Sequence, residues 1–141
     1  MGRIIAIDYG LKRTGIAVSD SDAVIAFPLE TVNSKDAIKF LINYLAKEKV
    51  DCVIVGMPRQ NNGSDSEIVP QVKIFIKELK NKFPRVEVKE EDERFTSVLA
   101  KRSLIDSGVK KMQRRDKALV DVTSATILLQ GYLEKKFSAE K

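Results

Sequence analysis

Short apolar runs alternate with turn-forming residues in the first quarter of the chain. The runs at 4–7 and 16–19 are separated by a turn rich in glycine and basic residues, which predicts an antiparallel hairpin. The first run is apolar at consecutive positions, as in a central strand that is covered on both faces. A third strand is predicted over 24–27, together with residues 30–32 beyond Pro28.

Helical spacing of apolar residues begins after this region. Ser34 is a candidate N-cap for a helix that runs to about residue 48. The remaining patterns predict, in chain order, a strand at 50–55, a helix around 70–79 with Pro70 in its first turn or at a kink, a strand at 86–89, a helix from Thr96 to just before Gly108, and a final helix from about 115 to 135. Strands first, and then alternating helices and strands, predict an α/β protein with a mixed five-stranded sheet, antiparallel at its start and parallel later, flanked by helices.

Composition narrows the chemistry that the chain can perform. The 141 residues predict a single domain over 1–141 and include no histidine, which excludes Ser–His and Cys–His catalytic pairs and histidine-containing zinc sites. Cys52 is the only cysteine, so an intrachain disulfide is excluded, and its apolar neighbours indicate a buried, unreactive thiol. No apolar stretch approaches the roughly 18 residues of a membrane span. The chain also enters a strand directly, so we expect a cytoplasmic protein without a signal peptide.

Two carboxylates adjoin or interrupt apolar segments, where a charged side chain costs free energy unless a partner or a ligand compensates it. Asp8 ends the apolar run of the predicted central strand, at the edge where ligands of open α/β sheets gather; the alternative is an Asp that caps the turn. Asp121 falls on the apolar stripe of the final helix, with Ala125 and Leu128, so its carboxylate is predicted to face the protein. Such a carboxylate needs a cation, and the alternative to a functional site is a structural ion pair with Lys117.

A third acidic site lies in the run from Glu87 to Glu93. Strand alternation places Asp92 on the face of Val86 and Val88, which favours Asp92 as the inward acid. Clustered carboxylates repel one another, and a divalent cation relieves that repulsion. Carboxylates without histidine or thiol partners suit Mg²⁺ or Mn²⁺, and two such ions can activate a water for phosphodiester cleavage.

Four short motifs, in order along the chain, resemble those of one family. They are residues 5–20, beginning Ile-Ala-Ile-Asp-Tyr-Gly, residues 56–64, from Gly-Met-Pro to Gly-Ser, Asp-Glu-Arg-Phe-Thr at 92–96, and Val-Asp at 120–121. Together they look like the motifs of the YqgF/RuvX family, with similarity from about residue 3 to 133. The resemblance implies a ribonuclease H-like fold related to the Holliday junction resolvase RuvC. Members of this family are assigned as pre-16S rRNA nucleases acting on the 5′ end, and were earlier assigned as Holliday junction resolvases.

The same resemblance implies roles for individual residues. It makes Asp8, Glu93 and Asp121 the metal-binding catalytic acids, with Mg²⁺ or Mn²⁺ as the cofactor of a hydrolase acting on phosphodiester bonds. The Asp-Glu-Arg motif points to Glu93, whereas alternation points to Asp92; we choose Glu93 and keep Asp92 as a candidate metal ligand. The residues at 123–124, Thr and Ser, stand where the family has small apolar residues, and they leave the acid set intact.

Basic residues offer docking places for an anionic backbone. The net charge is +5, from 25 Lys and Arg against 20 Asp and Glu, which allows a polyanionic partner. An exposed basic loop of no special role is the alternative, and Arg94 can pair with Asp92 instead of a phosphate. We expect Tyr9 and Phe95 to pack rather than to stack on bases. The candidate substrate-binding residues are Lys12, Arg13, Arg59, Arg94, Lys110, Lys111, Arg114, Arg115 and Lys117.

Several functions remain compatible with these residues. The first is processing of the 5′ end of pre-16S rRNA, with RNA and ribosomal precursor particles as partners. The second is resolution of branched DNA, which favours a homodimer making two paired cuts, although a monomer is also compatible with the sequence. The third is a non-catalytic module that binds nucleic acid or the ribosome. A phosphate-binding ATPase relative ranks last, because such folds usually need two lobes.

Overall fold

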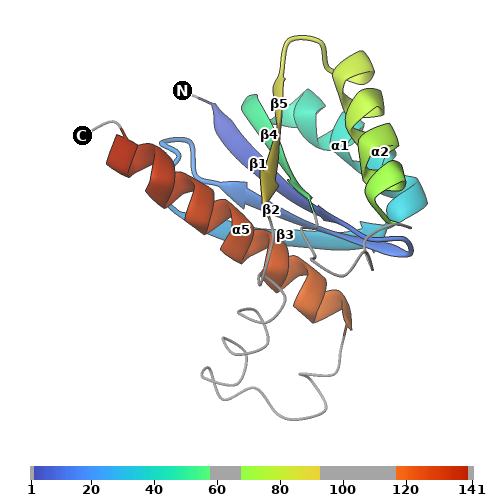
Figure 1. Cartoon of the computed structure of the whole chain (residues 1–141). Coiled ribbons are helices and arrows are strands. Elements are labelled where there is room, and N and C mark those ends of the chain that lie inside the picture. The colour runs from blue at the N-terminus through green and yellow to red at the C-terminus, as the bar shows by residue number, and fades with distance from the viewer. Residues whose placement is uncertain (1, 58–67, 93–116, 140–141) are drawn as a thin grey trace.

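The computed structural model describes residues 2–57, 68–92 and 117–139 (Figure 1). The strands in these residues are β1 Arg3–Tyr9, β2 Arg13–Ser19, β3 Ala26–Asn33, β4 Val50–Met57 and β5 Glu87–Asp92. They form one five-stranded sheet in the order β3-β2-β1-β4-β5. The pairs β1–β2 and β2–β3 are antiparallel, and the pairs β1–β4 and β4–β5 are parallel. The predicted mixed sheet, with the first strand at its centre, is confirmed.

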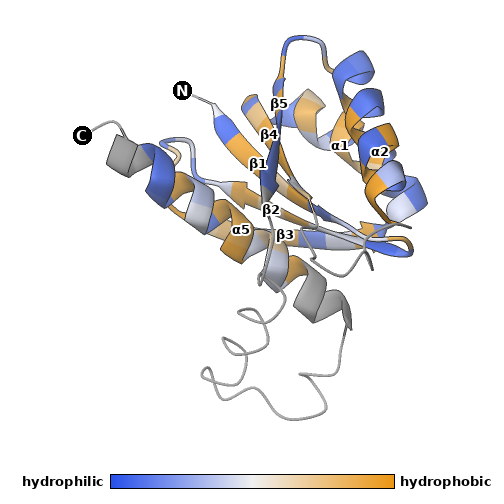
Figure 2. Ribbon diagram, viewed as in Figure 1, coloured by the Kyte–Doolittle hydropathy of each residue, from blue (hydrophilic) through white to orange (hydrophobic). Residues whose placement is uncertain are grey.

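Two helices cover one face of the sheet. They are α1, Ala37–Lys47, which follows the short 3₁₀ helix η1, Ser34–Asp36, and α2, Ile68–Lys82. The apolar sides of α1 and α2, including Leu41 and Leu79, share a core with Ile5 and Ile7 of β1, and all four side chains are fully buried. Figure 2 shows the hydrophobic sides of both helices turned toward the sheet and their hydrophilic sides turned outward. Pro70 lies in the first turn of α2, where its missing N–H has no helical partner to lose.

The opposite face is covered by one long helix, α5, Lys117–Ala139, which contacts β1, β2, β3 and β4. Leu129 of α5 is fully buried in a second core with Ile4 and Ala6 of β1 and with Cys52 of β4. Successive residues of β1 therefore enter two different cores, which explains why its sequence is apolar at consecutive positions. Cys52 is 7% exposed, which confirms the expected burial of this cysteine, and burial raises the pKa of its thiol. No helix in the described part of the chain is long and apolar enough to cross a membrane.

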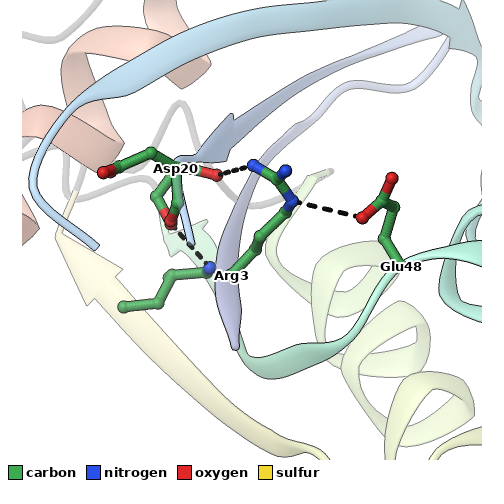
Figure 3. Close-up of polar contacts among 5 residues, drawn as sticks. Arg3, Asp20 and Glu48 are labelled. Carbon is green, nitrogen blue, oxygen red and sulfur yellow. Dashed lines mark hydrogen bonds and ion pairs between the residues drawn. The ribbon is translucent and has the colours of Figure 1, made fainter. Parts of the chain in front are cut away.

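Polar contacts close the end of the sheet at which β1 begins. The guanidinium of Arg3 lies 3.4 Å from the carboxylate of Glu48 and donates a hydrogen bond of 3.0 Å to the carbonyl of Ser19 (Figure 3). The neighbouring Asp20 accepts hydrogen bonds from two backbone N–H groups of the following turn, which hold its pKa below the usual value. These contacts stabilise the end of the sheet opposite Asp8.

Two local expectations differ from the structure. β3 is one continuous strand through Pro28, which is tolerated because β3 is an edge strand, and its register with β2 shifts between Ile16 and Ala17. Ser34 as the helix N-cap is wrong, because its side chain makes no capping bond and turns instead into a buried polar contact. The helix predicted from Thr96 lies outside the described residues.

Candidate functional site

Asp8 is the next-to-last residue of β1 and is half-buried. Alternate residues of β1 divide between the two cores: Ile5 and Ile7 pack beneath α1 and α2, and Ile4 and Ala6 pack beneath α5. Asp8 continues the second series, because strand residues two apart point to the same face. The register therefore assigns Asp8 to the face covered by α5, at the carboxyl end of the central strand.

α5 supplies the second acid of the predicted set. Its buried stripe includes Ala125, Leu128 and Leu129, and Asp121 precedes Ala125 by one helical turn, at a position of the same stripe. Figure 1 shows α5 running back along the sheet, with its last turns near the N-terminus of the chain. Its first turns consequently lie toward the end of the sheet where Asp8 is found. The side chains of Lys117 and Asp121 are outside the described part, so their predicted ion pair stays an untested alternative.

The register of β5 bears on the choice between Asp92 and Glu93. Asp92 pairs with Met57, which is buried in the core beneath α1 and α2, and Val88 packs against that same core. Lys89 and Glu91 instead contact side chains of α5: the ammonium of Lys89 lies 3.2 Å from a tyrosine hydroxyl, and Glu91 forms an ion pair with a lysine. Lys89 and Glu91 of β5 thus face α5, and Val88 faces the other two helices.

The alternation argument that favoured Asp92 finds no support in the packing of its neighbours, and because the side chain of Asp92 lies outside the described part, Asp92 stays a candidate ligand. Alternation grouped Asp92 with Val86 and Val88, and the structure packs these valines against the core opposite Asp8. Alternation gives no support to Asp92 as a partner of Asp8. Glu93, the choice that came from the family motif, lies outside the described residues and stays a prediction.

Two of the predicted basic residues follow Asp8 closely. Lys12 is exposed in the turn between β1 and β2, and Arg13 is the half-buried first residue of β2. The hairpin thus brings both to the end of the sheet that carries Asp8. Lys117 opens α5. The other predicted substrate-binding residues lie outside the described ranges: Arg59, Arg94, Lys110, Lys111, Arg114 and Arg115.

The aromatic residue beside Asp8 has a packing role. The ring of Tyr9 lies 4.7 Å from that of Phe75 in α2, measured between centroids and at an interplanar angle of 32°. Tyr9 is partly buried against the core beneath α1 and α2. This confirms the expected packing role of Tyr9, whereas Phe95 lies outside the described residues.

A buried hydroxyl pair holds the turn that follows Asp8. The side-chain oxygens of Thr14 and Ser34 lie 2.8 Å apart, and the Ser34 hydroxyl donates a hydrogen bond of 2.5 Å to the carbonyl of Gly10. The backbone N–H of Ser34 also donates to the carbonyl of Lys12, at 3.0 Å. Sequence reasoning missed this contact because the two hydroxyls are 20 residues apart. The only signal was a pair of small polar residues at the ends of apolar segments.

Replacing Ser34 by Ala is expected to lower the free energy of unfolding by about 1–3 kcal/mol, because the buried Thr14 hydroxyl and Gly10 carbonyl lose a partner. Chemical denaturation measures this change. The double variant with Thr14→Val should lose less than the sum of the two single variants, because both act on one contact. Additive losses would show that the two hydroxyls are not coupled.

One polar side chain near the predicted acids has no partner in the described part of the chain. Ser124 is 1% exposed, and its buried hydroxyl oxygen makes no hydrogen bond to any described residue. Its position in α5 is three residues beyond Asp121, on a neighbouring part of the helix surface. Within the described ranges, no three acidic, histidine or cysteine side chains form a group that could hold a metal. The predicted acid set depends on Glu93 and Asp121, whose side chains lie outside that part.

The chain is similar to proteins of one known family over nearly its whole length. The family model described as "RuvX: Holliday junction resolvase" matches residues 2–135. A protein of Bacteroides thetaiotaomicron named "Putative pre-16S rRNA nuclease" is 52% identical over 96% of this chain and 99% of its own length, and a protein of the same name from Flavobacterium psychrophilum is 51% identical over the same shares.

Solved structures show the fold. Thermus thermophilus RuvC in complex with a Holliday junction substrate superimposes with a TM-score of 0.62, at 15% identity, over 97% of this chain and 96% of the other. RuvC has a ribonuclease H-like fold, so the expected fold class is confirmed, and the names of the sequence relatives confirm the expected nuclease class for the family. The chain belongs to the RuvX family.

Proposed function

We propose that this chain, as a single domain, is a divalent-metal-dependent endonuclease that processes the 5′ end of pre-16S rRNA. The observation that carries the proposal is the placement of Asp8. It lies at the carboxyl end of the central strand, on the face covered by the helix that contains Asp121. Acids from distant parts of the chain would then share one edge of the sheet, where open α/β folds bind their ligands. Relatives at about 50% identity over nearly the whole chain are named as nucleases of this rRNA precursor.

The donor chemistry fits Mg²⁺ or Mn²⁺. The proposed ligands Asp8, Glu93 and Asp121 are carboxylates, and hard divalent cations prefer oxygen donors and keep several waters. The buried hydroxyl of Ser124, without a partner in the described residues, is suited to hydrogen-bond a water of such a hydrated ion. When bound, the ion would supply an activated water and charge stabilisation at the leaving oxygen.

The chain's own residues orient the substrate. Asp8 is held at the edge of a sheet whose central strand is buried on both faces, so its backbone position is rigid. Lys12 and Arg13 place positive charge at the same edge, where phosphates of a polynucleotide can dock. The hydroxyl of Ser34 fixes the turn that carries Lys12, because it bonds the carbonyl of Gly10.

Resolution of branched DNA is a second candidate. The matching family model is described as a Holliday junction resolvase, and the RuvC structure that superimposes was solved with a junction. Both reactions hydrolyse the same phosphodiester and can use the same acids. A resolvase needs a second active site for its paired cut, so it would act as a homodimer.

The decisive experiment offers two substrates to the purified chain. A 16S rRNA precursor with its 5′ extension and a four-way DNA junction are incubated with Mg²⁺, with Mn²⁺ or with chelator. We expect cleavage of the RNA at least about tenfold faster than of the junction, and a loss of about a hundredfold or more when the metal is removed. Gel analysis of end-labelled substrates measures both rates.

Each alternative gives a different result. Paired, symmetric cuts in the junction with intact RNA would replace RNA processing by resolution. Salt-sensitive binding without metal-dependent cleavage of either substrate would favour the non-catalytic module and overturn the nuclease proposal.

A further inference from the structure

An open groove lies between β2, β3 and α1, and it shares Arg13 with the edge of the sheet that carries Asp8. Its volume is about 450 Å³, which is within the size range of small-molecule sites. The groove follows one side of α1 and the carboxyl end of the edge strand β3. The lining residues that matter here are Arg13, Asn33, Asp36, Lys39, Phe40 and Asn43.

The lining combines the groups that recognise a nucleotide. Arg13 and Lys39 provide positive charge for a phosphate. Phe40 provides a half-buried ring against which a base can stack, and this ring lies nearly parallel to that of Tyr44, at an interplanar angle of 14° with centroids 6.3 Å apart. The carboxamide of Asn43 offers both a donor and an acceptor, which suits the edge of a base.

One carboxylate in the groove narrows the class of ligand. Asp36 is exposed at the start of α1 and lines the same groove as the two cations. A carboxylate repels a ligand that consists of phosphates alone, such as a pyrophosphate, and accepts hydrogen bonds from sugar or base donors. The 2′-hydroxyl of ribose is such a donor and is absent from DNA. The mixed lining therefore favours a ribonucleotide with a single phosphate per sugar.

The groove is close to Asp8 in the sheet. Asp8 pairs with Gly15, and Arg13, two residues before Gly15, pairs with Asn33 of β3. Two strand spacings, roughly 10 Å, separate β1 from β3. The groove lies on the α1 side and Asp8 on the α5 side, so a chain that reaches both must pass over the turn containing Lys12. This path is longer than the in-plane separation of the two strands, so more than one nucleotide lies between the groove and the cleaved bond.

We propose that the groove binds one nucleotide of the single-stranded RNA that flanks the cleaved bond. This identification of the polymer rests on the proposed function, whereas the groove's ability to bind a nucleotide rests on its own lining. The groove would thereby select single-stranded RNA and set the distance between the bound flank and the cut.

The test measures binding without cleavage. The full chain, labelled with ¹⁵N, is titrated with the RNA hexamer of adenylate in the presence of chelator, and the amide shifts are followed by NMR. We expect shifts at residues 31–43. Phe40→Leu, which keeps an apolar side chain without a ring, should raise the Kd about 5- to 10-fold. Lys39→Gln should raise it about 3-fold or more and reduce its salt dependence.

Matched controls separate the groove from general charge. Lys47→Gln removes a lysine from the same helix at a position that does not line the groove, and it should leave the Kd within about 2-fold. The DNA hexamer of the same sequence should bind at least about 3-fold more weakly than the RNA. Thermal melting of each variant confirms that it is folded.

The outcomes distinguish the two proposals. Unchanged affinity in both Phe40→Leu and Lys39→Gln, or shifts confined to other elements, would overturn the groove while leaving the nuclease proposal in place. Equal affinity for the DNA hexamer would overturn the selection of RNA. Shifts and affinity losses as expected, together with no metal-dependent cleavage of any substrate, would support the groove and overturn the nuclease proposal.

Discussion

Asp8→Asn is expected to slow metal-dependent cleavage by about a thousandfold, equivalent to about 4 kcal/mol of transition-state stabilisation. Asparagine has nearly the same shape as aspartate but no negative charge, so it binds a divalent cation poorly. Asp8 lies at the end of a strand buried on both faces, and the substitution leaves this packing unchanged. The rate is measured on the preferred substrate at saturating Mg²⁺, and calorimetric titration of Mn²⁺ provides a readout that is independent of cleavage.

Asp22→Asn is the matched control. Asp22 is exposed between β2 and β3, at the other end of the hairpin strand from the predicted acids, so the same chemical change should leave the rate within about twofold. A rate for Asp8→Asn within tenfold of the unchanged protein would exclude Asp8 as an essential ligand. An equal loss in the Asp22 variant would show that net charge, not the acid site, controls the rate.

Leu129→Ala is expected to lower the free energy of unfolding by about 2–5 kcal/mol, the range for a fully buried leucine whose loss leaves a cavity. The side chain of Leu129 is 0% exposed and lies in the core that joins α5 to β1 and β4. Because α5 also carries Asp121, this core holds the helix against the sheet that bears Asp8. Denaturant titration followed by circular dichroism measures the change.

Ile74→Ala serves as the control for this substitution. Ile74 is an aliphatic residue in α2 that is 54% exposed, so its truncation should change the free energy of unfolding by less than about 1 kcal/mol. Similar losses for both variants would mean that burial of α5 against the sheet is not a main source of stability.

The local pattern of apolar residues predicted the strands of the sheet correctly, but it predicted the ends of the elements less well. The consecutive apolar residues of β1 predicted a central strand, and the two cores explain that pattern, because Ile5 and Ile7 enter one core and Ile4 and Ala6 the other. Ser34 shows where the local signal was misleading. It has the composition of an N-cap, but a stronger set of partners, the Thr14 hydroxyl and the Gly10 carbonyl, lies more than 19 residues away in sequence.

Some residues of the candidate site could also be chosen from the sequence, and others could not. Asp8 and Asp121 could be chosen from the sequence, because a carboxylate at the end of an apolar strand or on an apolar helical stripe is costly without a cation. The choice between Asp92 and Glu93 could not be made from the sequence. Alternation shows which residues of a strand share a face, but it does not show which of the two buried faces of the sheet that is. In the structure Val88 packs beneath α1 and α2, away from α5.

The sequence alone determined the α/β class, the central strand and the absence of histidine chemistry, because periodicity and residue type are local properties of the chain. Only the tertiary structure decided which face of the sheet α5 covers, which hydroxyls hold the turn after Asp8, and that β2, β3 and α1 border an open groove. These features arise from contacts between segments that are distant in sequence, and such contacts depend on the packing of the whole sheet.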